Sequence, residues 1–467
     1  MAIKSASDVV RRSLSGSASA VSGLFGDQTI RLGVTGLSRA GKTVFITSLV
    51  ANLLNRGRMP QLAAVANGVI EAAYLQPQPD DTVARFDYES HLDTMLGPDP
   101  QWPDGTRTVS ELRLSLKIRP TGFLSGLQGL QTVHLDIIDY PGEWLLDLAL
   151  LDKTYDDWAA EALATAQKRV EAGAFLGLLS TVDCSAKFDD VTAGTLAAAY
   201  ADYLQTARAN GYANCTPGRF LLPGDLAGSP ALTFAPLPEG EADRRSLRTE
   251  MQRRFEAYKS RVVRPFFRNH FAKLDRQVVL VDVMKALANG PDALADLEKA
   301  MGDILTAFRP GRNGFLQEVL LGKRVERILF AATKADHLHH EQHPALTDLI
   351  GAMTANARDR ADFSGAKTQA MSLAALRTTT ETTVGDNLPA VQGKILETGK
   401  NAAYYPGDMP SSPTAILAEA RKGADEWEAG PIASMRFGPP TMKVGAGDGP
   451  PHIRMDKALQ FLMGDLL

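Results

Sequence analysis

The stretch GLSRAGKT, residues 36–43, decides the fold because of what lies on either side of it. The apolar, β-branched run TIRLGV (29–34) precedes it, and Phe45, Leu49 and Leu53 recur after it at helical spacing. Gly-x-x-x-x-Gly-Lys-Thr between a strand and a helix is the phosphate-loop pattern. We therefore predict a nucleotide phosphate site here; an ordinary glycine turn would need neither flanking element.

Each fixed position of this loop has a physical role. The glycines let successive backbone N–H groups point inward, and the following helix adds its positive N-terminal end. Lys42 is expected to reach the β and γ phosphates and to act in catalysis, and the Thr43 hydroxyl to coordinate Mg²⁺. The other predicted nucleotide contacts in the loop are Gly36, Ser38, Arg39, Ala40, Gly41 and Val44.

The second motif is DYPG, residues 139–142, at the end of the apolar run TVHLDII. Asp139 is expected to hold Mg²⁺, and Gly142 to let its N–H approach the γ phosphate without a Cβ in the way. Glu143 occupies the position where many GTPases carry a water-orienting Gln, so it is a candidate catalytic residue. It is equally explained as an acidic residue that stabilises the first turn of a helix.

The polar loop DGTRTVSEL lies between the first two motifs. Thr106 is the candidate second Mg²⁺ ligand, with Thr108 as the rival. Arg107 is a candidate arginine finger in cis that stabilises charge on the transferring phosphoryl group. A polar loop with a solvated Arg is the simpler alternative.

The third motif is TKAD, residues 333–336, which again ends an apolar run. A carboxylate at Asp336 can accept two hydrogen bonds from guanine, from N1–H and the 2-amino group, whereas adenine offers no such pair. The Lys334 stem can cover the base. Thr333 stands where Asn is usual, so a preference for ATP, as in an ATPase, remains an alternative. The remaining predicted base contacts are His337 and, after the last strand, the backbone of Ala374, Ala375 and Leu376.

Composition limits the other functions. The apolar fraction of 44% and the net charge of −4 are typical of a globular protein with no general attraction to nucleic acid. Two cysteines exclude a disulfide framework and favour a reducing compartment, and no apolar run is long enough to span a bilayer. The run HLHHEQH (337–343) is predicted to be a solvated helix start more readily than a metal site, and the basic stretch 253–273 a solvated helix face.

The patterns predict an α/β fold with several segments. Strands alternating with helices indicate a parallel sheet covered on both faces, and SELRLSLKI (110–118) and TVHLDIID (132–139) are predicted to pair in antiparallel fashion. We divide the chain into an N-terminal arm (1–27), a nucleotide-binding domain (28–55, 105–143 and 276–380), an inserted segment (56–104), a helical insertion (144–275) and a C-terminal extension that packs on the core (381–467).

The chain resembles the YcjX family of bacterial stress-associated P-loop proteins. The resemblance rests on GLSRAGKT, DYPGEWLLDL, GRFLLPGDLAGSPALTFAP, RQVVLVDV, LFAATKADH and PHIRMDKALQFLMGD, in that order along the chain. It implies a Ras-like P-loop NTPase domain with a mostly parallel sheet, an antiparallel edge strand and helical insertions, as in Gα subunits.

The resemblance also implies what the protein does. It implies a cytoplasmic GTPase that binds GTP or GDP with Mg²⁺ and is linked to envelope stress, with a protein effector or membrane-protein partner at the inner membrane. Slow GTP hydrolysis by a switch protein is our leading hypothesis. An ATPase, and a scaffold that binds nucleotide with little turnover, remain the alternatives.

Overall fold

A computed structural model describes residues 27–37, 39–106, 108–120, 129–240, 243–306, 325–363, 365–423, 427 and 432–467. Ser38 and Arg107, two of the predicted site residues, lie outside the described residues, as does the predicted N-terminal arm apart from Asp27. No helix in the described part of the chain is long and apolar enough to cross a membrane.

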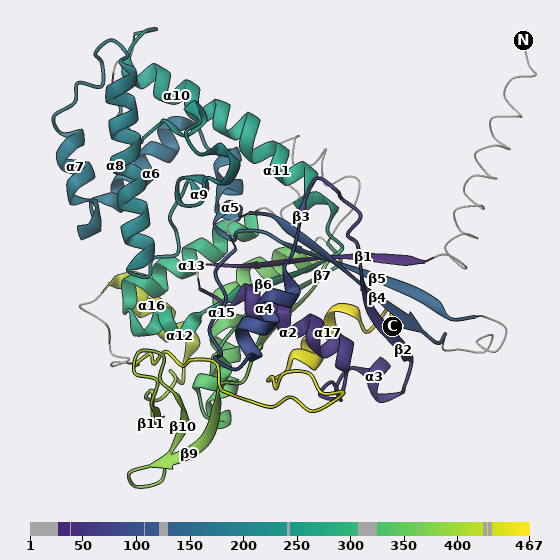
Figure 1. Ribbon diagram of the computed structural model, residues 1–467. Helices are drawn as coiled ribbons and strands as arrows, with labels where there is room; N and C mark the ends of the chain where they lie inside the picture. Colours follow the sequence, from purple (N-terminus) through teal and green to yellow (C-terminus); the bar gives the residue numbers. More distant parts are fainter. Residues whose placement is uncertain are drawn as a thin grey trace, which may run out of the picture.

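The centre of the molecule is an eight-stranded sheet in the order β2-β4-β5-β1-β6-β7-β8, with β3 paired to β4 (Figure 1). Strands β5, β1, β6, β7 and β8 run parallel. The predicted antiparallel pairing of β4 with β5 is confirmed, and β2 pairs in antiparallel fashion with β4 at the sheet edge, so that β4 is the strand that runs against β2 and β5. The strands are β1 Gln28–Gly36, β2 Ile70–Gln76, β3 Ala84–Arg85, β4 Ser110–Ile118, β5 Gln131–Asp139, β6 Arg276–Val281, β7 Arg327–Ala332 and β8 Lys367–Ser372.

Strand β4 shows where the alternating pattern predicted correctly and where it did not. Its leucines are buried, as expected, but the predicted wet face is partly covered: Glu111 and Ser115 are also buried. Two polar pairs reach across to β5: the Ser115 hydroxyl lies 2.8 Å from His134 Nδ1, and Arg113 forms a two-bond ion pair with Asp136. The Glu111 carboxylate lies 3.5 Å from Arg31 of β1. Directly opposed polar side chains of this kind stabilise a sheet face without solvent.

Both faces of the parallel strands are buried. Val279 and Val281 of β6 belong to one apolar cluster, and Val278 and Leu280 belong to the other, because successive side chains point to opposite faces. Helices α13 (Pro291–Thr306) and α15 (His343–Phe363) cover the first face, and α2 (Lys42–Asn55) and α17 (Met455–Met463) cover the second.

Helices dominate the chain between β5 and β6. Figure 1 shows α6, α7, α8 and α10 gathered beside the sheet. Trp158 stacks on Phe255 with ring centroids 4.9 Å apart, and Phe234 meets both rings edge-on, so this group has an aromatic core. The elements are α5 Glu143–Leu146, η2 Asp147–Asp152, α6 Tyr155–Ala166, η3 Val170–Ala172, α7 Gly173–Leu179, α8 Asp190–Ala209, α9 Gly218–Leu221, η4 Gly224–Leu226, η5 Pro230–Leu232, α10 Leu247–Tyr258, η6 Lys259–Val263, α11 Arg264–Asn269 and η7 Phe271–Lys273.

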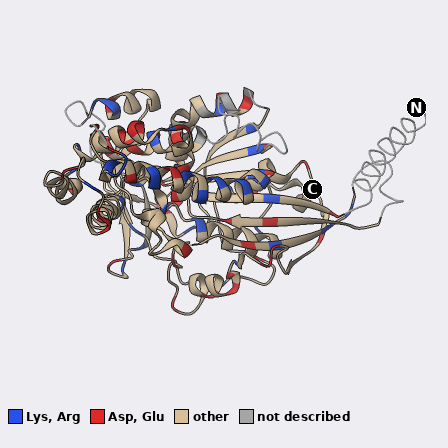
Figure 2. Cartoon of the chain, turned by 90° about the horizontal axis from the view of Figure 1, so that it is seen from above, with Lys and Arg blue, Asp and Glu red and all other residues tan. Residues whose placement is uncertain are grey.

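The basic stretch 253–273 lies on α10, η6, α11 and η7. Several of its cations are paired with acids: Arg253 with Glu250, Arg254 with Asp190 and Lys259 with Glu256. Figure 2 shows basic and acidic residues mixed along the helices.

After β8 the chain forms a second, three-stranded antiparallel sheet in the order β11-β10-β9, which the sequence patterns did not predict. The last helix, α17, buries Met455, Leu459 and Leu462 in the same cluster as α2. The remaining elements are α3 Ala63–Ala66, α4 Tyr88–Leu96, α12 Val283–Ala288, η8 Ala335–His337, η9 His340–Gln342, β9 Thr379–Val384, β10 Leu388–Lys394, β11 Asn401–Tyr404 and α16 Pro413–Lys422.

Candidate nucleotide site

The predicted motifs meet at one edge of the sheet. The phosphate loop follows β1, DYPG follows β5, TKAD follows β7, and residues 373–376 follow β8. These strands are parallel, so their carboxyl ends lie on the same side. Ligands of open α/β sheets bind at this edge.

The phosphate loop has the backbone that an anion site needs. Arg39 and Gly41 both adopt left-handed φ angles, of 64° and 81°. Gly41 caps α2, no side chain of the residues that the structure describes caps the first N–H groups of that helix, and its first turn carries no acid. The positive end of a 14-residue helix is therefore left open toward the loop. Ala40 is buried beneath the loop, and Val44 is half-buried.

Lys42, Thr106 and Asp139 converge below the loop. Lys42 Nζ lies 2.6 Å from Asp139 Oδ1 and donates a hydrogen bond to the Tyr140 carbonyl at 2.8 Å. Thr106 donates to Asp139 Oδ2 at 2.6 Å, and Thr43 donates to the carbonyl oxygen of Asp104 at 3.3 Å. Thr106 is thus bonded to the Asp139 carboxylate, and Thr43, 63 residues earlier in the sequence, is bonded to the loop that carries Thr106.

These residues fit Mg²⁺. The donor set consists of two hydroxyls and a carboxylate, the hard oxygen ligands that Mg²⁺ prefers. Asp139 Oδ1 is buried, and its partner among the described residues is the Lys42 ammonium at 2.6 Å, an ion pair. A buried carboxylate oxygen that already accepts a positive charge is a suitable ligand for a metal cation. The rival ligand Thr108 is exposed and makes no contact with Asp139.

Gly142 contacts the phosphate loop itself. A Cβ at this position would lie 2.1 Å from the carbonyl oxygen of Gly36, far inside any real contact. The φ angle of Gly142 is −63°, so the restriction is one of space and not of backbone conformation. We expected a glycine here because a side chain would block the γ phosphate. In this structure the glycine is required because a side chain would collide with the phosphate loop.

Glu143 begins α5 and is buried, with its carboxylate Oε1 2.6 Å from Arg208 Nη2. Arg208 lies in the last turn of α8, 65 residues along the chain. Two residues beyond Gly142 comes Trp144, whose ring lies under the Arg219 guanidinium at 3.3 Å. Neither arginine belongs to a nucleotide motif, so neither could be predicted from the motifs alone.

Asp147, which follows α5, is fully enclosed by the helical part of the chain. It accepts hydrogen bonds from the Gly218 N–H at 2.7 Å and from the Tyr258 hydroxyl. Burial raises the pKa of Asp147 to about 7, and these two hydrogen bonds oppose that rise only in part.

The TKAD motif is held by three neighbouring segments. Asp336 is buried, and its Oδ2 accepts from both the backbone N–H (2.8 Å) and the hydroxyl (2.6 Å) of Thr378. Lys334, with a left-handed φ of 60°, forms an ion pair with Asp282 at the end of β6, which stretches its apolar stem across the strand ends. Thr333 bonds to the Val281 carbonyl through its N–H at 2.9 Å.

The remaining predicted base contacts are only partly free. The Ala374 N–H already donates to the Ile453 carbonyl at 3.1 Å, so it is not available to guanine O6. For Ala375 and Leu376, no acceptor of the N–H lies among the described residues. The His337 ring meets Phe437 edge-on at 5.0 Å, and burial lowers the pKa of this imidazole.

Positive charge gathers between the phosphate loop and the base motif. Lys285, in α12, is half-buried, and its pKa is lowered by burial and by the nearby cations Arg39 and Lys334. Sequence reasoning missed Lys285, Asp282 and Thr378. Asp282 could have been found, because it ends an apolar run in the same way as Asp139 and Asp336.

The histidine run divides into different roles. His343 is buried and its Nε2 lies 2.7 Å from the Ala335 carbonyl, so it holds the TKAD turn. His339, His340 and Glu341 place one ligand atom each within 4.8 Å of one another, but His340 and Glu341 are exposed. His340 Nδ1 lies 3.0 Å from Glu381 Oε2 and so already has a partner.

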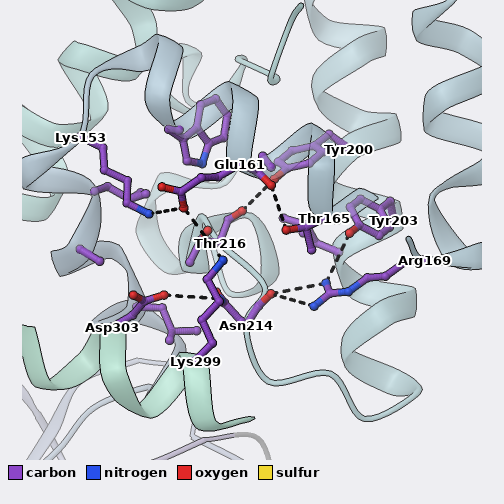
Figure 3. A pocket seen from close by; sticks show the side chains of 16 residues that line it. Lys153, Glu161, Thr165, Arg169, Tyr200, Tyr203, Asn214, Thr216, Lys299 and Asp303 are labelled. Carbon is purple, nitrogen blue, oxygen red and sulfur yellow. Dashed lines mark hydrogen bonds and ion pairs between the residues drawn. The ribbon is translucent and has the colours of Figure 1, made fainter. Parts of the chain in front are cut away.

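A cavity of about 40 Å³ lies elsewhere, between η2, α6, α8 and α13 (Figure 3). Figure 3 shows Lys153, Glu161 and Lys299 close together at its wall. None of its lining residues belongs to the phosphate loop, DYPG or TKAD. Its volume suits a few water molecules and is far below that of a nucleotide.

Comparison with known proteins identifies the family of the chain. The model of the YcjX-like family, DUF463, matches residues 30–467. The chain belongs to this family. Among its curated relatives, a YcjX of Escherichia coli (strain K12), named a Ras-like GTPase, is 36% identical over 460 residues, covering 94% of this chain and 96% of the relative. A second YcjX with the same name, from Shewanella oneidensis, is 35% identical over 471 residues, covering 94% of this chain and 95% of its own length.

The expected family and the expected fold class are both confirmed. The family matches the one suggested by the sequence motifs, and the mostly parallel sheet, in which β4 runs against β2 and β5, agrees with a Ras-like P-loop domain. The site roles of individual residues stay predictions.

Proposed function

We propose that this YcjX-like protein is a guanine-nucleotide switch that binds GTP and GDP with Mg²⁺ and hydrolyses GTP slowly. The observation that carries the proposal is the convergence of Lys42, Thr106 and Asp139 beside the N-terminus of α2, where Asp139 Oδ1 is paired with the Lys42 ammonium and Oδ2 accepts from Thr106. The names of the curated relatives support the nucleotide assignment.

The geometry around Asp336 supports guanine over adenine. An ionised carboxylate offers about four lone-pair sites on its two oxygens. Thr378 uses two of them, both on Oδ2, and thereby fixes the orientation of the group. Oδ1 keeps two sites, which equals the number of donors that guanine presents through N1–H and its 2-amino group.

Each side chain of the phosphate site then has a distinct task. Lys42 leaves Asp139 and neutralises the β and γ phosphates, while the N-terminal N–H groups of α2 bind phosphate oxygens. Thr43, Thr106 and Asp139 hold Mg²⁺, which when bound withdraws charge from the phosphates. Glu143 orients the attacking water. Arg107 is proposed as a finger in cis from its sequence position alone.

Mg²⁺-dependent single-turnover hydrolysis of GTP tests this proposal. The wild type is expected to release phosphate only with Mg²⁺, and Asp139→Asn is expected to lose hydrolysis while it keeps GDP. Equal turnover with and without Mg²⁺ would contradict the metal assignment. Tight binding of GTP with no release of phosphate in any condition would favour a scaffold.

The biological setting is proposed on the family resemblance. We place the protein in the cytoplasm, with a role in bacterial stress and a membrane-protein or other protein effector. A deletion strain that shows no change in survival or reporter response under envelope stress would contradict that setting without touching the chemistry.

A further inference from the structure

The Glu143–Arg208 pair links the nucleotide site to the helical part of the chain. Glu143 directly follows Gly142, which packs on the phosphate loop. Its Oε1 lies 2.6 Å from Arg208 Nη2, and the Glu143 side chain is only 7% exposed. A buried, close ion pair of this kind fixes the direction in which the carboxylate points.

The backbone of Glu143 is fixed as well. A Cβ on Gly218 would lie 2.2 Å from the Glu143 carbonyl oxygen, so the backbone at residue 218 and the backbone at residue 143 are in direct contact, with no space for a side chain between them. Asp147 is bonded to the Gly218 N–H and the Tyr258 hydroxyl, and the Trp144 ring donates to the Leu222 carbonyl at 3.0 Å. The backbone at Glu143 is therefore held against α9 and α10, and among the described residues Arg208 of α8 is the partner that directs its side chain.

Charge gives this pair a chemical consequence. A lone carboxylate beside a triphosphate suffers like-charge repulsion, which is why a neutral Gln would serve better in its place. The Arg208 guanidinium removes the net charge of Glu143 and still leaves Oε2, which accepts no hydrogen bond from the described residues.

The pair also keeps a donor. The Nε–H of Arg208 is buried and has no hydrogen-bond partner among the residues that the structure describes. Buried donors are rarely left alone, so a water molecule is the natural partner. The pair thus offers one acceptor oxygen and one N–H donor without net charge, as a neutral Gln amide offers its carbonyl oxygen and N–H groups.

We propose that Arg208 is a positioning residue for GTP hydrolysis: it holds Glu143 in a neutral pair that orients the attacking water, so that α8 contributes to the reaction. The proposal rests on the GTPase function proposed above. It predicts that the need for Arg208 disappears once residue 143 carries no charge.

A double-mutant cycle in single-turnover GTP hydrolysis tests this. Arg208→Ala is expected to slow hydrolysis by about 100-fold, the usual loss for a misplaced catalytic group, with GDP affinity within a few-fold of wild type. Arg208→Lys should restore part of the rate, since it keeps the charge. With Glu143→Gln already present, Arg208→Ala should cost less than about fivefold, a small fraction of the catalytic effect expected of a water-orienting group.

Arg219→Ala is the matched control, because it removes an arginine from α9, which also lies against this turn, and the Arg219 guanidinium stacks on Trp144 and not on Glu143. Its effect should be the same with Glu or Gln at position 143. Equal losses for Arg208→Ala in both backgrounds, or no loss in either, would overturn the positioning role. If the wild type itself released no phosphate from GTP, the proposed GTPase function would be wrong. This result differs from a failure of the positioning role alone, in which the wild type hydrolyses GTP and the loss caused by Arg208→Ala does not depend on residue 143.

Discussion

Replacing Gly142 by Ala tests how closely the DYPG turn is fitted to the phosphate loop. The added Cβ would lie 2.1 Å from the Gly36 carbonyl oxygen and 3.2 Å from the Leu37 nitrogen. Because an ordinary contact needs more than about 3 Å, the two segments must separate by roughly 1 Å. The φ angle of −63° suits Ala, so no backbone strain is added.

Two effects of this substitution can be given magnitudes. Overpacking of this kind costs about 1–3 kcal/mol of unfolding free energy. A displacement of about 1 Å between a catalytic turn and the phosphates lowers the rate by about 100-fold. Denaturant unfolding and single-turnover GTP hydrolysis measure the two separately.

Gly194→Ala in α8 is the control for this prediction. A Cβ there meets nothing within 4 Å, so Ala should raise helix stability by about 0.5–1 kcal/mol without affecting hydrolysis. The reasoning would be refuted if Gly142→Ala matched the wild type in both unfolding and hydrolysis, since the contact with Gly36 would then not exist in solution.

Three further predictions follow from the same geometry. The raised pKa of Asp147 means that this carboxyl group binds its proton more tightly in the folded state than in the unfolded state. The protonated group therefore stabilises the fold fully below about pH 4, and this contribution is lost as the pH rises through about 7. Asp147→Asn should flatten the fall of unfolding free energy with pH, which denaturant unfolding across that range measures. Thr106→Ala should raise the Mg²⁺ concentration needed for half-maximal hydrolysis, whereas Thr108→Ala should not, as a metal titration would reveal. Thr378→Val should weaken GDP binding by about tenfold, since loss of the Thr378 hydroxyl frees Asp336 to turn; unchanged affinity in a fluorescence titration would count against the base site.

The core of the fold was predictable from the sequence. The motifs that contain Lys42 and Asp336 follow apolar strands, and parallel strands place their carboxyl ends together whatever else the chain does. The antiparallel pairing of β4 with β5 followed from an alternating run that a glycine-containing link joins to a second apolar strand, and it is confirmed.

Other parts depended on contacts between distant segments. Arg208 meets Glu143 only because the helices after β5 fold back on the turn, so no local pattern marks it. Glu111 and Ser115 look solvent-facing in the alternating pattern but are buried, with polar partners on β1 and β5. Strand β9 is rich in Thr, and the short strands β9, β10 and β11 lack the apolar alternation that identifies a strand.

The central claim is that Asp336 reads guanine at a Mg²⁺-dependent phosphate site. Its most direct test is competition of GTP and ATP against a fluorescent GDP analogue, with Mg²⁺, for the wild type and Asp336→Asn. The account predicts that GTP displaces the analogue from the wild type at a concentration roughly 100-fold lower than ATP does, as expected for two hydrogen bonds to a buried carboxylate, and that Asp336→Asn loses most of this difference. Equal displacement by ATP and GTP from the wild type would contradict it.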